Sequence, residues 1–126
     1  MKLKMGEKYT RREISRMLGG PTVVYLPYKN SQIVCGCFDC SRSLNPGAPE
    51  EVVYGPGPIV EQTAEMVYRQ HSAIPIFIRR SVGNWEYVGD YRCIDHSRDP
   101  ELLKDRMARY PERGKIVGVL RFEKVG

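Results

Sequence analysis

Six segments of the chain show the short apolar runs or strict alternation that are typical of β-strands. Each is bounded by glycine, proline or small polar residues, and they are residues 23–26, 32–38, 51–54, 74–80, 85–94 and 115–124. Three further segments repeat apolar residues at the spacing of a helical turn, and they are residues 11–18, 59–70 and 101–110. Six strands with two to three short helices predict an α+β domain built on a curved β-sheet or a partly open β-barrel.

The ends of several elements carry local sequence signals. Thr10 and Glu13 have the spacing of a capping box at the start of the first helix. Asp99 precedes a proline where the third helix begins, as an N-cap residue does. Residues 23–26 and 32–38 flank a short polar turn, so they are expected to pair as a β-hairpin.

The strand at 85–94 has an unusual arrangement of rings. Its aromatic residues Trp85, Tyr87 and Tyr91 alternate with a second set that is polar except for Val88, and Gly89 stands between two of the rings. Because side chains alternate between the two faces of a strand, the three rings are expected on one face. A glycine between rings leaves a groove in which a flat ring can lie, although such a strand can equally pack in the core.

The length of 126 residues predicts one domain over residues 1–126, and no linker or repeat interrupts it. No apolar run approaches the ~20 residues that span a bilayer, so no membrane partner is expected. The first residues, 1–7, lack the apolar stretch of a signal peptide, and we expect a cytoplasmic protein. The sequence does not indicate an oligomeric state.

The charge balance favours a polyanionic partner. Lys and Arg number 20 against 15 Asp and Glu, which gives a net charge of +5. Most of the cations are arginines, whose planar guanidinium groups match phosphate geometry. Arg11, Arg12 and Arg16 lie off the apolar stripe of the first helix, and we expect them to face solvent or a phosphate.

The cysteines and histidines give little support to a metal site or an enzyme. Cys37 and Cys40 have the spacing of a zinc-binding pair, but no second pair exists to complete four ligands. No phosphate-binding loop or nucleophile elbow is present, so we predict no catalytic residue, no metal and no cofactor. A metal-dependent nuclease or hydrolase stays open as an alternative, and its ligands would come from Cys37, Cys40, Cys93 and His96.

The remaining candidates are aromatic and basic side chains interleaved along the chain. Aromatic faces stack nucleobases at roughly 1–3 kcal/mol each, and arginines neutralise phosphates. The candidate base pocket consists of the rings Tyr25, Tyr28, Tyr54 and Trp85 with Asp39 and Asn45 as readers of a base edge. The candidate phosphate-binding residues are Lys29, Arg42, Arg79 and Arg80.

Residues 85–93, which run WEYVGDYRC, resemble the YDG signature of SRA domains, a pattern of aromatic–x–Tyr–Asp–Gly–x–Tyr–Arg–Val. Residues 75–80 resemble the strand that leads into this signature, and residues 59–70 the helix before it. The resemblance extends over about 57–95 and departs from the pattern at Val88, where the signature has aspartate.

This resemblance implies a PUA-like, partly open barrel that binds DNA carrying a modified cytosine and accepts the flipped base in an aromatic pocket. It also implies a possible nuclease partner, because bacterial relatives are often joined to HNH-type nucleases that act in restriction. The departure at Val88 leaves the identity of the recognised base open. A PUA-like module that binds RNA or a modified nucleotide remains a second interpretation.

Overall fold

The computed structural model describes residues 3–126 of the chain. Within this range it has three α-helices, one 3-10 helix and eight strands. In chain order they are β1 (Lys8–Tyr9), α1 (Arg11–Leu18), β2 (Tyr28–Lys29), β3 (Gln32–Ile33), β4 (Gly36–Asp39), β5 (Glu51–Tyr54), α2 (Pro58–Gln70), β6 (Ile74–Ser81), β7 (Asn84–Ser97), α3 (Pro100–Arg109), η1 (Pro111–Arg113) and β8 (Gly118–Lys124).

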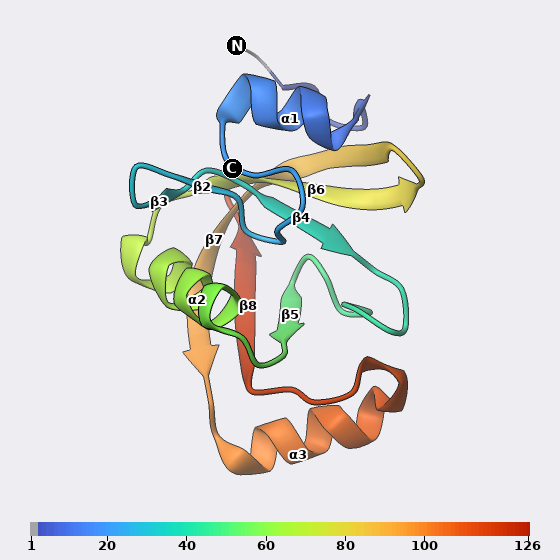
Figure 1. The fold of residues 1–126 in the computed structure, drawn as a ribbon, viewed down its shortest axis with the longest axis vertical. Helices are drawn as coiled ribbons and strands as arrows, with labels where there is room; N and C mark the ends of the chain where they lie inside the picture. The colour runs from blue at the N-terminus through green and yellow to red at the C-terminus, as the bar shows by residue number, and fades with distance from the viewer. Residues whose placement is uncertain (1–2) are drawn as a thin grey trace.

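The main sheet is a strongly curved layer with the strand order β4-β6-β7-β8-β5, and β1 pairs with the outer edge of β7. The long β7 bends through the whole molecule, so that it pairs with β6 at one end and with β8 at the other (Figure 1). All of these pairs are antiparallel except that of β4 with β6, which is parallel. The expected α+β architecture with a nearly closed, barrel-like sheet is confirmed.

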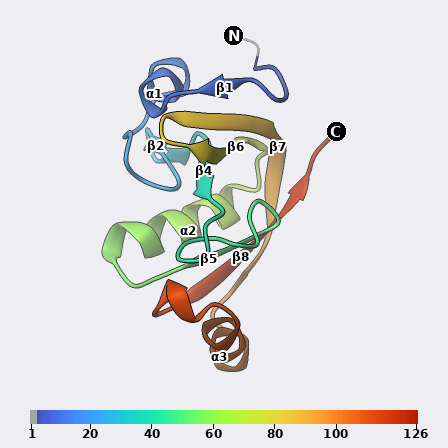
Figure 2. The same ribbon diagram turned by 90° about the vertical axis from the view of Figure 1, so that its right-hand side faces the viewer.

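Each helix covers a different part of this sheet. Figures 1 and 2 place α1 and α3 at opposite ends of the molecule, with α2 across the middle. The main core lies beneath α2, where Ala64 and Val67 pack with sheet residues such as Phe38 and Leu120. Smaller clusters of buried residues lie beneath α1 and α3. Among residues 3–126, no helix has the length and apolar character to cross a bilayer.

One loop residue bridges the two edge strands of the open sheet, β4 and β5, which do not pair with each other. The backbone N–H of Asn45 donates to the carbonyl of Asp39 at the end of β4 over 2.9 Å. Its side-chain Oδ1 accepts from the N–H of Val53 in β5 over 2.7 Å. Asn45 is itself buried, with 7% of its surface exposed. The 40–50 loop therefore bridges the gap between the strands through one residue, whose backbone bonds to β4 and whose side chain bonds to β5.

The predicted hairpin of 23–26 with 32–38 forms only in part: the N–H of Cys37 donates to the carbonyl of Tyr25 over 2.8 Å, and the N–H of Val34 donates to the carbonyl of Pro27 over 2.9 Å. Residues 23–26 form bends, and 32–38 divides into β3 and β4. The hairpin that does form pairs β2 with β3 through a tight turn at Asn30 and Ser31, both with positive φ. Pro27 has no N–H to donate, so the ladder between the two segments is interrupted there. The regular ladder of β4 is with β6, far away along the chain.

The expectation that the rings of β7 share one face is also wrong. Ile76 pairs with Gly89 and the next residue of β6, Phe77, pairs with Tyr87, so Val88 is the extra residue of a β-bulge. The bulge reverses the alternation of faces. As a result Tyr87 packs in the cluster beneath α1, whereas Tyr91 packs in the main core beneath α2.

The capping signals are confirmed. The Thr10 side chain accepts from the N–H of Glu13, whose carboxylate accepts from the N–H of Thr10 in return. The Asp99 carboxylate accepts from the N–H of Leu102. The last strand starts at Gly118, three residues later than its sequence pattern indicates.

Candidate functional site

A cavity of about 530 Å³ lies at the open side of the barrel, between β5, the start of α2 and the 40–50 loop. Its walls are mainly apolar, and three of the predicted base-pocket residues, Tyr25, Asn45 and Tyr54, line it. The other lining residues are Val23, Val24, Leu44, Val53, Gly55, Pro56, Ile59, Val60, Thr63, Arg113 and Lys115. We call this space the first cavity.

A second cavity of about 420 Å³ adjoins the first and shares part of its wall, including Tyr25 and Asn45. Its other side carries two more predicted base-pocket residues, Asp39 and Trp85, with the predicted phosphate ligand Arg79. The structure therefore gathers five of the six predicted base-pocket residues around two adjoining cavities, although they come from four separate segments of the chain.

Tyr25 stands between the two cavities. Its hydroxyl donates to the carbonyl of Val60 in α2 over 2.7 Å, and its ring lies 6.5 Å from that of Phe38. The half-buried ring is fixed at both ends, and burial raises the pKa of its hydroxyl well above the usual range. Tyr25 is thus a neutral, rigid aromatic wall.

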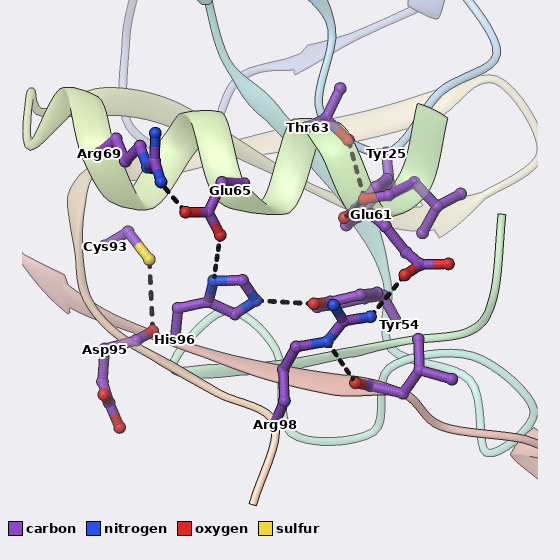
Figure 3. A network of polar contacts seen from close by, with 12 residues as sticks. Tyr25, Tyr54, Glu61, Thr63, Glu65, Arg69, Cys93, Asp95, His96 and Arg98 are labelled. Carbon is purple, nitrogen blue, oxygen red and sulfur yellow. Dashed lines mark hydrogen bonds and ion pairs between the residues drawn. The ribbon is translucent and has the colours of Figure 1, made fainter. Parts of the chain in front are cut away.

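Tyr54 is held behind this wall by a partly buried polar network (Figure 3). Its hydroxyl lies 2.6 Å from Nε2 of His96, and Nδ1 of His96 lies 3.3 Å from the Glu65 carboxylate. Only 1% of Tyr54 is exposed, so its ring offers little free surface to a ligand. The network ties β5, α2 and β7 together and fixes the floor of the first cavity.

Burial lowers the pKa of His96 below its usual value, although Glu65 opposes this shift. Because the unfolded chain then binds a proton more readily than the native protein, the free energy of unfolding should fall as the pH drops below about 6.5. Above that pH the contribution is fully present. Chemical denaturation between about pH 7.5 and 5.5 measures the slope.

The only other histidine, His71, is exposed and provides the matched control. We expect His96→Gln to flatten the pH dependence and His71→Gln to preserve it. The reverse pattern would show that His96 does not control this dependence.

Asp39 and Arg79 form an ion pair at the rim of the second cavity, with 3.1 Å between Oδ2 and Nη1. Partial burial opposes ionisation of Asp39, but hydrogen bonds from the Ser41 N–H and from Arg79 outweigh it and lower the pKa of the carboxyl. Asp39 is therefore a carboxylate at neutral pH, with lone pairs left to accept from an amino group.

The other predicted residues do not line these two cavities. Tyr28 lines a third cavity of about 500 Å³ beside the β2–β3 turn, which shares Ile59 and Thr63 with the wall of the first cavity. Arg80 pairs with Glu86 over 2.9 Å, and Arg42 lies 4.0 Å from a glutamate. The aliphatic part of the Lys29 side chain packs against the backbone of Gly19.

Three cations of the two cavities were missed by the sequence reasoning. Arg11 was expected to face solvent or a phosphate, but its guanidinium stacks 5.1 Å above the Trp85 ring and donates to the carbonyl of Val24. Arg113 and Lys115 line the first cavity from the segment that follows α3. No local sequence pattern could have identified Arg113 and Lys115, because they reach the cavity only when the last segment packs beside β5.

The cysteines are mostly core residues. Cys35, Cys37 and Cys93 are buried, and burial raises the pKa of Cys93 to about 11. Among residues 3–126, no group of three or more His, Cys, Asp or Glu side chains is arranged to hold a metal ion.

The family model described as "Domain of unknown function (DUF6697)" matches residues 8–116 of the chain. The chain belongs to the DUF6697 family. Among curated proteins, none matches this DUF6697 chain in sequence.

The fold of the DUF6697 chain is similar to that of SRA domains. A structure of the SUVH5 SRA domain in complex with hemi-methylated CG DNA matches 99% of this chain and 90% of its own, with a TM-score of 0.66 and 11% identity. The same domain bound to fully hydroxymethylated CG DNA matches 98% of this chain and 89% of its own, with a TM-score of 0.64 and 11% identity. The SRA-like fold implied by the signature is confirmed.

A restriction enzyme shares the fold as well. ScoMcrA, a Type IV phosphorothioation-dependent restriction endonuclease, has a TM-score of 0.55 and 12% identity to the DUF6697 chain. The match covers 97% of this chain but only 26% of the endonuclease. The DUF6697 fold thus corresponds to about a quarter of that larger protein.

Proposed function

We propose that this chain binds DNA that carries a chemical modification, and that it holds the modified nucleotide in the first cavity. One observation carries the proposal: an open cavity of about 530 Å³, walled by a fixed tyrosine, lies in an SRA-like barrel. Its volume lies within the roughly 300–1,000 Å³ of pockets that hold small ligands. The similar SUVH5 structures are complexes with methylated and hydroxymethylated DNA, which supports the same class of ligand here.

The roles of the cavity residues follow from their geometry. An extruded base can stack on the exposed side of Tyr25, whose ring is already fixed by its bond to Val60. Asn45 uses its Oδ1 for Val53, which leaves its amide N–H groups to donate to the edge of the base. Asp39, in the adjoining cavity, is an acceptor for an amino group.

Phosphate contacts surround the cavities in this proposal. Arg79 lies at the rim of the second cavity, and Lys29, Arg42 and Arg80 are exposed elsewhere on the surface. Arg79 and Arg80 each already pair with a carboxylate, so a phosphate must compete with that partner. The chain acts as a binding module, and any cutting of DNA comes from a separate nuclease.

The test is a fluorescence-anisotropy titration of the chain with short duplexes of one sequence. The duplexes contain unmodified cytosine, 5-methylcytosine, 5-hydroxymethylcytosine or a phosphorothioate linkage, and an RNA duplex is included. We expect at least about a tenfold preference for one modified DNA over the unmodified duplex. Equal affinity for all DNAs, or a preference for RNA, would overturn the proposal and favour an RNA-binding module.

Tyr25→Ala should weaken binding of the preferred duplex by about 1 kcal/mol or more, because a stacking surface is lost. Tyr25→Phe is the matched control, since it keeps the ring and removes only the bond to Val60. The carbonyl of Val60 still accepts from Thr63 in that variant. If both variants bind equally weakly, stacking on the Tyr25 ring is not what holds the base.

A further inference from the structure

Arg113 is the half-buried cation of the first cavity. It ends η1, and its guanidinium lies beside the backbone of Gly55, with Nη1 and Nη2 3.7 and 3.9 Å from the point where a Cβ of that glycine would stand. Its Nε is fully buried, and within residues 3–126 it has no hydrogen-bond partner. Lys115 lines the same cavity two residues later.

No carboxylate of residues 3–126 lies within ion-pair distance of Arg113. Its neighbour along the chain, Glu112, approaches Arg42 instead, at 4.0 Å. The acidic residue in the first turn of α2, Glu61, pairs with Arg98 and accepts from the N–H of Gly57. Burial consequently lowers the pKa of Arg113, with only the Tyr25 hydroxyl acting in the other direction.

A second half-buried arginine shows how this fold treats a structural charge. Arg106 donates from Nε and Nη2 to the two carboxylate oxygens of Glu51, over 2.6 and 2.9 Å, and also pairs with Asp105. Leaving a partly buried charge without such a partner destabilises a protein. Arg113 has no such carboxylate, but it lines the first cavity, so a ligand in that cavity can reach its guanidinium.

We propose that Arg113, assisted by Lys115, binds the phosphate group of a nucleotide in the first cavity. The guanidinium fork matches the oxygens of a phosphate, and the apolar surroundings strengthen such a charge-assisted contact. Gly55 leaves the approach to the guanidinium open because it has no side chain. This inference rests on the proposed function for the identity of the ligand, but the phosphate site itself can be tested without modified DNA.

The experiment is a calorimetric titration of the full chain with dCMP, inorganic phosphate and deoxycytidine, together with melting curves. We expect dCMP to bind at least about tenfold more tightly than deoxycytidine, because only dCMP carries the phosphate. Arg113→Met should abolish this difference. It should also raise the melting temperature without ligand, because it removes an uncompensated charge; an arginine with a structural role predicts a decrease.

Two control variants keep the result interpretable. Arg92→Met removes an equal charge from an exposed position on β7 and should leave both the tenfold difference and the melting temperature unchanged. Arg113→Lys keeps the charge but loses the fork, and intermediate affinity for dCMP is expected. Equal affinity of the wild type for dCMP and deoxycytidine, or an unchanged difference in Arg113→Met, would overturn the phosphate site.

The source of the phosphate is distinguished by a duplex in which one internucleotide phosphate is replaced by a neutral methylphosphonate. A loss of affinity that depends on Arg113 assigns the site to the DNA backbone, and stabilisation by inorganic phosphate or dCMP alone assigns it to a free phosphate. A further outcome is that modified and unmodified duplexes bind with equal affinity while the affinity for dCMP still depends on Arg113. That result would contradict the recognition of a modified base but would support the phosphate site.

Discussion

Gly118→Ala should destabilise the fold by about 3 kcal/mol or more, the largest effect that we expect from a single methyl group in this chain. Gly118 lies in β8 opposite Tyr54 of β5, and a Cβ added there would overlap the end of the tyrosine ring. The ring cannot move aside easily, because it is buried and its hydroxyl is fixed by His96. Urea denaturation of the wild type and the variant measures the loss.

A double-mutant cycle makes this prediction specific. Tyr54→Leu shortens the ring side chain that the new methyl group would strike, so Gly118→Ala should cost less than about 1 kcal/mol in that background. The added methyl group should also displace the Tyr54 ring, which forms the floor of the first cavity. Nucleotide binding should therefore weaken in Gly118→Ala. Equal costs in both backgrounds would show that the ring is not the obstacle.

Asn45→Ala should destabilise the fold by about 2 kcal/mol and weaken DNA binding as well. The variant leaves the buried N–H of Val53 without an acceptor and removes the bridge between β5 and the 40–50 loop. Because Asn45 lines both cavities, their shared wall should lose its fixed position at the same time. Denaturant melts and anisotropy titrations report the two effects separately.

Ser43→Ala serves as the control for Asn45→Ala, since Ser43 is exposed in the same loop and bonds only to the hydroxyl of Ser41. A stability change within about 0.5 kcal/mol is expected for it. Asn45→Asp keeps the acceptor oxygen for Val53 but loses the amide donors, and should keep more stability than Asn45→Ala. Should Asn45→Ala prove as stable as Ser43→Ala, the bridge does not hold the barrel closed.

Much of the local structure could be predicted from the sequence because neighbouring residues decide it. The capping box of Thr10 with Glu13 and the cap at Asp99 depend on groups three residues apart, and both form. The helices α1, α2 and α3 begin and end within one residue of the predicted bounds, because each has an apolar stripe and a proline or cap at its start. The aromatic signature at 85–93 indicated the SRA-like fold, which the structure confirms.

The errors arose where a distant segment competes with a near one. Residues 23–26 and 32–38 have the apolar character of two strands, but only isolated backbone bonds join them, whereas β4 pairs along its whole length with the distant β6. The bulge at Val88 depends on the register between β6 and β7, which no alternation pattern contains. It moves Tyr87 and Tyr91 to opposite faces and removes the ring-lined groove from that strand.

The amino-acid pattern was enough to predict the helices, most of the strands, the aromatic and basic composition and the signature of the fold. The candidate site could be located only after folding was known, because the walls of the first cavity come from segments that are far apart along the chain. In the folded chain Arg113 lies in the cavity wall without a carboxylate partner, whereas Arg106 pairs with two carboxylates, those of Glu51 and Asp105. Each of the two arginines follows an acidic residue in the sequence. They differ in whether the fold places a carboxylate beside the guanidinium.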